Sequence, residues 1–276
     1  MLLTTCLWIA GGTVAALLLG ALALHIIPRL GGAGRAFSDV LCRAPALDLL
    51  ITYFTIAPMV AGPIIAGWAG LGAAIFGQCV ALVIWEILHS LAHPRARKGP
   101  RILKVHNRAL GPWRNYTAVW ITAIAVPGFW IVRVCQWLVY PPLVWLVRLP
   151  PYRHADWVNV SRHKFEGLVG HDLIWCPYCD WMTGIWSLGS EMLRNVESFW
   201  CPIRFRSDKK CANCAVDFPD INNGWVAAGG TMAQVTDTLQ SRYELGEATT
   251  GLSRRGEYHT WFGHPARLTI NGKPHK

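Results

Sequence analysis

Four long apolar runs occupy the first half of this chain, and they constrain its fold more than any other feature. The sequence has 276 residues, of which 53% are hydrophobic and only 15% are charged, and the apolar residues concentrate before residue 150. A run of about 20 apolar residues is long enough to cross the bilayer core as a helix. We therefore expect a mainly α, polytopic helical membrane protein with apolar runs at residues 2–27, 47–70, 71–92 and 116–149.

The boundary between the second and third runs is rich in residues that bend or end helices. Gly62, Pro63, Gly67, Gly70 and Gly72 all lie there. Proline removes a helical hydrogen bond, and glycine permits backbone angles that other residues avoid. The sequence therefore predicts a tight helical hairpin or a kinked span at this boundary.

The fourth run has an ambiguous length, because it is too long for one span and short for two. It also contains Pro127, Gly128, Arg133 and the pair Pro141-Pro142. Irregular backbone at membrane depth is tolerated where protein or water satisfies it. We expect residues 116–149 to form a broken, re-entrant or interface-lying hairpin.

The distribution of positive charge predicts the orientation. Basic residues cluster after the first and third runs, whereas the turn between the second and third runs is uncharged. The positive-inside rule then places the N-terminus outside and the C-terminal region in the cytoplasm, as for an integral protein of a bacterial inner membrane. Since much of the formal charge of +10 flanks membrane segments, we expect a lipid bilayer as partner and no nucleic acid.

Two Cys-x-x-Cys pairs lie in the polar second half, at Cys176–Cys179 and Cys211–Cys214, with Cys201 between them. Each pair can present two thiolates from one tight turn to a tetrahedral ion. In a reducing compartment such pairs are typical of metal ligands rather than disulfides. We expect a ribbon-like zinc site with four cysteine ligands. Iron also suits four thiolates, and a cysteine group without metal or one disulfide pair is the remaining alternative.

The stretch between the two cysteine pairs predicts a helix over residues 182–200. Leu188, Met192, Val196 and Phe199 recur there at helical spacing. Such a helix would bring Cys201 back beside the pairs, as an alternative fourth ligand or as a support for the ligands. Two further candidate metal ligands, His163 and His171, lie shortly before the first pair.

A second group of ionisable residues lies at the end of the third run. Glu86, His89 and His93 are at positions i, i+3 and i+7, so a helix would project them from one face, and His106 follows across the basic loop. Ionisable groups at a membrane helix end are costly unless they are paired, hydrated or bound to metal. Imidazole with carboxylate suits iron or zinc. Alternatively, the histidines cap the helix or hydrogen-bond lipid headgroups.

Two short segments resemble a known family. Trp85-Glu-Ile-Leu-His-Ser-Leu-Ala-His-Pro94 and Lys104-Val-His-Asn-Arg-Ala-Leu-Gly-Pro-Trp113 resemble the first two histidine boxes of the membrane fatty-acid hydroxylase and sterol desaturase superfamily. The resemblance implies hairpins of membrane helices that hold a cytoplasmic-side di-iron centre for O₂ activation. It also implies that His89 and His93 are first-box ligands and that His106 is a second-box ligand. The sequence departs from the family at Asn107, where the second box has another histidine, and it has no doubled-histidine third box.

These patterns divide the chain into a membrane domain at 1–150, a cysteine- and histidine-rich metal module at 151–217, and a loop-rich region at 218–276. The first functional hypothesis is an iron-dependent oxidoreductase that acts on a lipid-like substrate and takes electrons from a donor. Its catalytic residues would be Glu86, His89, His93 and His106. The alternative is a non-catalytic membrane subunit or assembly factor whose zinc module holds a membrane protein partner.

Overall fold

The computed structural model describes residues 1–147, 149, 151–207, 209–210, 221–243, 269–270 and 273–274. Three of its helical segments, Leu2–Arg29, Ile56–Ala92 and Pro112–Val147, are long and apolar enough to cross a membrane. This confirms the predictions of a mainly helical chain and of helices suited to a membrane, whereas a C-terminal metal module is not shown. The chain divides into two compact units. Unit 1 is Met1–Pro127 with His154–Ile185, and unit 2 is Gly128–Arg153 with Trp186–Lys276.

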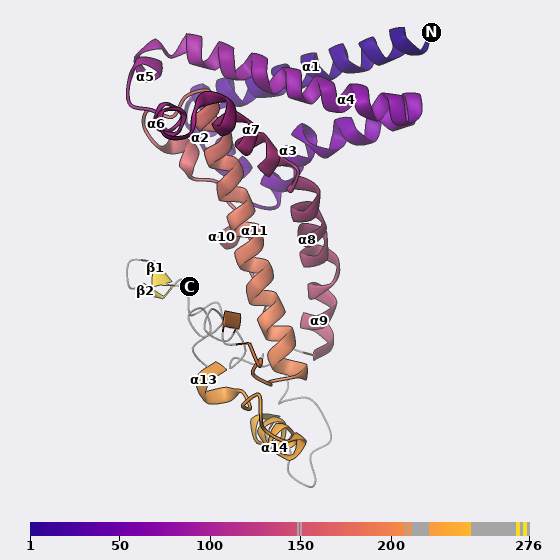
Figure 1. Cartoon of the computed structure of the whole chain (residues 1–276), viewed down its shortest axis with the longest axis vertical. Helices are drawn as coiled ribbons and strands as arrows, with labels where there is room; N and C mark the ends of the chain where they lie inside the picture. The colour runs from indigo at the N-terminus through magenta and orange to yellow at the C-terminus, as the bar shows by residue number, and fades with distance from the viewer. Residues whose placement is uncertain are drawn as a thin grey trace. The chain divides into compact units, whose positions relative to one another are not determined.

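Unit 1 begins with helices that lie against one another. Helix α1 (Leu2–Ile26) runs alongside helix α4 (Ile56–Ala92), as Figure 1 shows. A glycine permits this approach, because a Cβ on Gly77 of α4 would come within 2.7 Å of the Ala10 carbonyl oxygen of α1. Between the two helices the chain forms three short elements: the 3-10 turn η1 (Ile27–Arg29), α2 (Gly31–Leu41) and α3 (Ala46–Phe54).

Helix α4 consists of two helical arms joined by a sharp turn. Ala66 and Gly67 have non-helical backbone angles, and Gly67 adopts a φ of +56°. A Cβ on Gly70 would clash with the Gly62 carbonyl oxygen. Residues eight apart lie about 12 Å apart along a straight helix, so this close approach requires the second arm to fold back on the first. The tight hairpin that the glycines predict is therefore confirmed.

Helix α3 ends and the first arm of α4 begins on either side of Thr55. Gln78 of the second arm donates hydrogen bonds to the carbonyl oxygens of Phe54 and Thr55, at 2.9 and 2.7 Å. Pro58 stands four residues after Phe54 and has no N–H, so the Phe54 carbonyl oxygen lacks a helical donor, and a buried polar group without a partner is costly. The Gln78 side chain thus supplies hydrogen bonds to the backbone at the break, and it links the start of α4 to the second arm.

The fourth apolar run is broken, as predicted, whereas a re-entrant or interface-lying hairpin there stays a prediction. The run forms three successive helices, α7 (Pro112–Ala123), α8 (Val126–Leu138) and α9 (Tyr140–Val147). The interruptions fall at Ile124–Ala125 and at Val139. Before them, the basic loop of unit 1 forms α5 (Pro94–Lys98) and α6 (Ile102–Leu110), and the later part of unit 1 contains α10 (His154–Trp157) and the 3-10 turn η2 (Arg162–Lys164).

Helix α11 (His171–Trp200) is the longest uninterrupted element, with 30 residues (Figure 1). It contains the helix predicted over 182–200 but begins eleven residues earlier. Leu188 and Met192, two of the residues that predicted it, are buried. Pro177 lies inside the helix. Proline has no N–H, so the Leu173 carbonyl oxygen lacks its usual helical donor, yet the helix continues on both sides.

Unit 2 is held together by a buried polar cluster. Asn195 is fully buried and donates hydrogen bonds to the hydroxyl oxygens of Tyr140, at 2.9 Å, and of Tyr152. Tyr152 in turn donates to Glu191 at 3.2 Å. The remaining elements of unit 2 are α13 (Ile221–Gly224), α14 (Met232–Tyr243) and the antiparallel strands β1 (Thr269–Ile270) and β2 (Lys273–Pro274).

Candidate functional site

The predicted histidine row lies at the C-terminal end of α4. The His89 and His93 rings stack with centroids 4.3 Å apart, and Trp85 stacks on His89 at 4.7 Å. His25, near the end of α1, meets both imidazoles edge-on at centroid distances of 6.4 and 6.1 Å. We refer to His25, His89 and His93 as the imidazole cluster. No local motif identifies His25, because only the packing of α1 on α4 brings it to this place.

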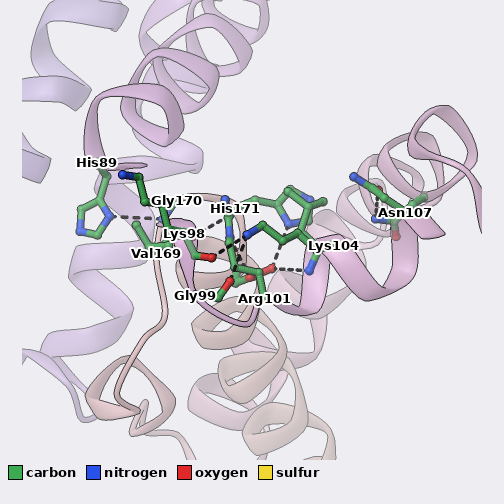
Figure 2. Close-up of polar contacts among 12 residues, drawn as sticks. His89, Lys98, Gly99, Arg101, Lys104, Asn107, Val169, Gly170 and His171 are labelled. Carbon is green, nitrogen blue, oxygen red and sulfur yellow. Dashed lines mark hydrogen bonds and ion pairs between the residues drawn. The ribbon is translucent and has the colours of Figure 1, made fainter. Parts of the chain in front are cut away.

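Backbone contacts assign the ring protons of His89 and His93. The Gly170 N–H donates to His89 Nδ1 at 3.2 Å, as Figure 2 shows. Nδ1 is then an acceptor, so a neutral His89 ring carries its proton on Nε2. His93 Nδ1 lies 3.0 Å from the His89 carbonyl oxygen. It must donate to this oxygen, which leaves His93 Nε2 as an acceptor. The two rings therefore offer one donor and one acceptor.

Glu86 and His106 do not join the imidazole cluster as one ligand set. Glu86 accepts a hydrogen bond from the Tyr116 hydroxyl at 2.9 Å, and His106 is exposed on α6. Within the ranges that the structure describes, no group of three or more His, Cys, Asp or Glu is arranged to hold a metal ion. The Nε2 proton of His89 also opposes metal binding through that atom. The described geometry therefore shows no shared ligand set for the four residues, and the iron site that the family resemblance implies stays a prediction.

A large apolar cavity lies beside the imidazole cluster within unit 1. Its volume is about 1570 Å³, which exceeds the roughly 300–1,000 Å³ of ordinary small-molecule pockets. Helices α1, α2, α3, α4, α7 and the beginning of α11 contribute apolar side chains to its wall. Polar groups are few, and they include the imidazole cluster, Arg29, Gln78, Cys42 and His163. The cavity therefore combines a large apolar volume with a small number of polar groups.

A buried ion pair fixes the basic loop to α11. Arg101 Nε lies 3.3 Å from Asp172 Oδ2, and the two side chains are only 8% and 4% exposed. Asp172 also accepts from the Leu103 N–H at 3.1 Å, which satisfies a free donor in the first turn of α6. Burial alone would raise the pKa of Asp172, but the His171 ring, the Arg101 charge and the Leu103 amide hold this pKa below its usual range.

The two histidines predicted as further metal ligands lie in different surroundings. His171 is 5% exposed, and its Nδ1 lies 3.6 Å from Asp172 Oδ1, so the polar group beside this ring is the carboxylate of the buried ion pair. His163 instead contacts a cysteine far away in the sequence, with Nε2 3.6 Å from Cys42 Sγ. Burial lowers the pKa of His163 and raises that of Cys42. At neutral pH the pair is therefore a thiol beside a neutral imidazole.

The first predicted cysteine pair lies on helix α11 rather than in a separate turn. Cys176 is partly buried, which raises the pKa of its thiol, and Cys179 is exposed. Cys201 directly follows the last residue of this helix. The first pair belongs to unit 1 and Cys201 to unit 2, so the expected place of Cys201 beside the pair stays a prediction. Cys211 and Cys214 lie outside the described residues, so the four-cysteine site stays a prediction.

Comparisons with known proteins add no candidate function. No protein family, curated protein or solved structure matches this chain.

Proposed function

We propose that this chain is an integral membrane protein that binds a lipid-like molecule in the cavity of unit 1. The cavity of about 1570 Å³ with its apolar wall carries the proposal. An apolar space of this size between helices in a bilayer gains dispersion contacts when hydrocarbon fills it. The lipid tail would lie along the apolar side chains of α1, α4 and α7.

The imidazole cluster is the natural place for the polar end of such a molecule. His89 Nε2–H and His93 Nε2 supply one donor and one acceptor, assigned by the contacts of their other ring nitrogens. Arg29, whose guanidinium donates to the His25 carbonyl oxygen, adds positive charge at the same part of the wall. A hydroxyl or carboxyl oxygen matches these groups, because it can accept from one ring and, when protonated, donate to the other.

The iron-dependent oxidoreductase is a separate hypothesis that rests on the sequence resemblance. Lipid binding in the cavity requires only the apolar wall and the imidazole cluster. Elemental analysis of the same purified protein separates the two ideas. Iron lost in the double variant His89→Ala/His93→Ala would support the oxidoreductase, and lipid binding by iron-free protein supports the binding function proposed here.

A pair of neighbouring substitutions on α4 tests the lipid site. Leu82 lines the cavity, whereas Val83 is the next residue, is 36% exposed and lies outside the lining. Filling the cavity with Leu82→Trp should weaken the binding of a fluorescent long-chain fatty acid at least tenfold, and Val83→Trp should leave it within twofold. Equal affinity in both variants, with both proteins eluting as folded particles in detergent, would refute the proposed site.

A further inference from the structure

Cys42 and His163 form a thiol–imidazole pair on the wall of the cavity. Their Sγ and Nε2 atoms lie 3.6 Å apart although the residues are 121 positions apart in the sequence. Both side chains line the cavity that the proposed lipid would occupy. The other ring nitrogen, His163 Nδ1, is buried and has no hydrogen-bond partner among the described residues. A thiol with an adjacent imidazole is the arrangement that activates cysteine as a nucleophile.

The backbone holds this pair in place from both sides. The segment that contains Cys42 is paired with the segment before His163, through Val160 N–H to the Cys42 carbonyl oxygen at 2.8 Å and Ala44 N–H to the Val158 carbonyl oxygen at 2.9 Å. Two groups such as these are useful chemically only when their geometry is fixed by surrounding contacts.

Helix α11 fixes the other side of the turn that carries His163. Asp180 accepts from the Ser161 and Arg162 N–H groups at 2.7 and 3.1 Å. Lys164 makes a surface ion pair with Asp39 of α2 at 2.8 Å. The thiol and the imidazole are thus placed by contacts from α2, the 158–160 segment and α11.

We propose that Cys42 is an acyl-accepting nucleophile, with His163 as its general base, that takes a long-chain acyl group from an acyl thioester such as acyl-coenzyme A. His163 Nε2 removes the thiol proton as Sγ attacks the carbonyl carbon. A new C–S bond forms, the C–S bond of the donor breaks, and His163 returns the proton to the leaving thiolate. No electrons are exchanged with another reagent. The acyl chain would then lie in the cavity, so this inference rests on the proposed lipid site.

Position and charge suit this chemistry. Cys42 directly follows α2 in the connection between the first membrane helix and the hairpin, and cysteines beside membrane segments are typical sites of S-acylation. Burial and the nearby Asp39 carboxylate raise the pKa of the Cys42 thiol, so its attack depends on proton removal by His163. Arg43 and Lys164 partly offset this rise. Their positive charge would also attract the phosphates of an acyl-coenzyme A.

The experiment uses the full chain purified in detergent and incubated with alkyne-labelled palmitoyl-coenzyme A. Intact mass, peptide mapping and cleavage by neutral hydroxylamine identify a thioester. The wild type should gain one adduct at Cys42. Cys42→Ala should lose this adduct, His163→Gln should form it at least tenfold more slowly, and Cys79→Ala should match the wild type. Cys79 is the matched control, because it lines the same cavity and is likewise partly buried.

Binding of a fluorescent fatty acid, which cannot acylate a thiol, is measured in the same preparations. Wild-type protein that binds this probe but forms no adduct would overturn the acylation proposal and leave the lipid site intact. An adduct that persists in Cys42→Ala, or that forms at the wild-type rate in His163→Gln, would also overturn it. Cys42→Ser, which keeps the size of the side chain, covers a failure of the alanine variant to fold, and it should give no hydroxylamine-sensitive product.

Discussion

Loss of Asp172 should destabilise unit 1. Its carboxylate is 4% exposed and pairs with Arg101, which is also buried. Removing one partner of a buried ion pair typically costs about 3–5 kcal/mol, because the other charge is left without compensation. We expect Asp172→Asn to lower the midpoint of thermal unfolding in detergent by several degrees. Asp39→Asn, which breaks the exposed pair with Lys164, is the control and should leave the midpoint unchanged.

The same carboxylate predicts how stability changes with pH. The pKa of Asp172 is below its usual range in the folded chain, so ionised Asp172 stabilises the fold at every pH above its unfolded value of about 3.9. This contribution is lost as the pH falls through the lower, folded-state pKa. The difference in unfolding midpoint between wild type and Asp172→Asn should be constant from pH 7 to pH 5 and shrink below about pH 4. A difference that instead shrinks between pH 7 and pH 5 would contradict the assignment.

Substitutions of two histidines with different surroundings distinguish the proposed lipid site from the predicted iron site. His89 belongs to the imidazole cluster, and His106 is exposed on α6. Because one hydrogen bond contributes about 0.5–1.5 kcal/mol, His89→Ala should weaken binding of a fluorescent fatty acid roughly threefold to tenfold, whereas His106→Ala should not change it. Equal weakening in both variants would mean that His89 and His106 act together, which would contradict a lipid site that involves His89 alone of the two.

At the scale of elements, the hairpin of α4 depends on a glycine contact. A Cβ on Gly70 would clash with the Gly62 carbonyl oxygen, whereas a Cβ on Gly72 would meet nothing within 4 Å. Gly70→Ala should therefore force the arms apart and cost about 1–3 kcal/mol, the usual range for overpacking. Gly72→Ala is the matched control and should be neutral or slightly stabilising in a helix. Thermal unfolding in detergent measures both, and equal midpoints would rule out the close approach.

The sequence predicted elements more reliably than the contacts between them. The hairpin, the broken fourth run and the helix after residue 182 follow from glycine, proline and helical periodicity, which act locally. The Cys176–Cys179 spacing predicted a turn, but residues three apart also lie on one face of a helix, and this spacing cannot distinguish the two. The pairing of Cys42 with His163 and the approach of His25 to His89 depend on tertiary packing across long stretches of sequence, which leaves no local pattern.

At the scale of the molecule, the hairpin makes the charge distribution of unit 1 consistent with one orientation. Helix α1 would cross the membrane once; α3 with the first arm of α4 would cross back, and the second arm would cross again. The basic loops after α1 and after α4 then lie on the same side, as the positive-inside rule requires. A single straight α4 would place those loops on opposite sides. The orientation with the N-terminus outside remains a prediction that this arrangement makes testable.

Thiol labelling in intact cells tests that orientation. Trp68 lies at the turn between the arms and is 87% exposed, and Lys98 lies in the basic loop and is exposed. A membrane-impermeant maleimide should label Trp68→Cys from outside, and it should label Lys98→Cys only after the cells are permeabilised. The wild-type chain gives the background from its native cysteines. Labelling of both positions from the same side would mean that the arms do not form two crossings, and labelling of Lys98→Cys alone from outside would reverse the orientation.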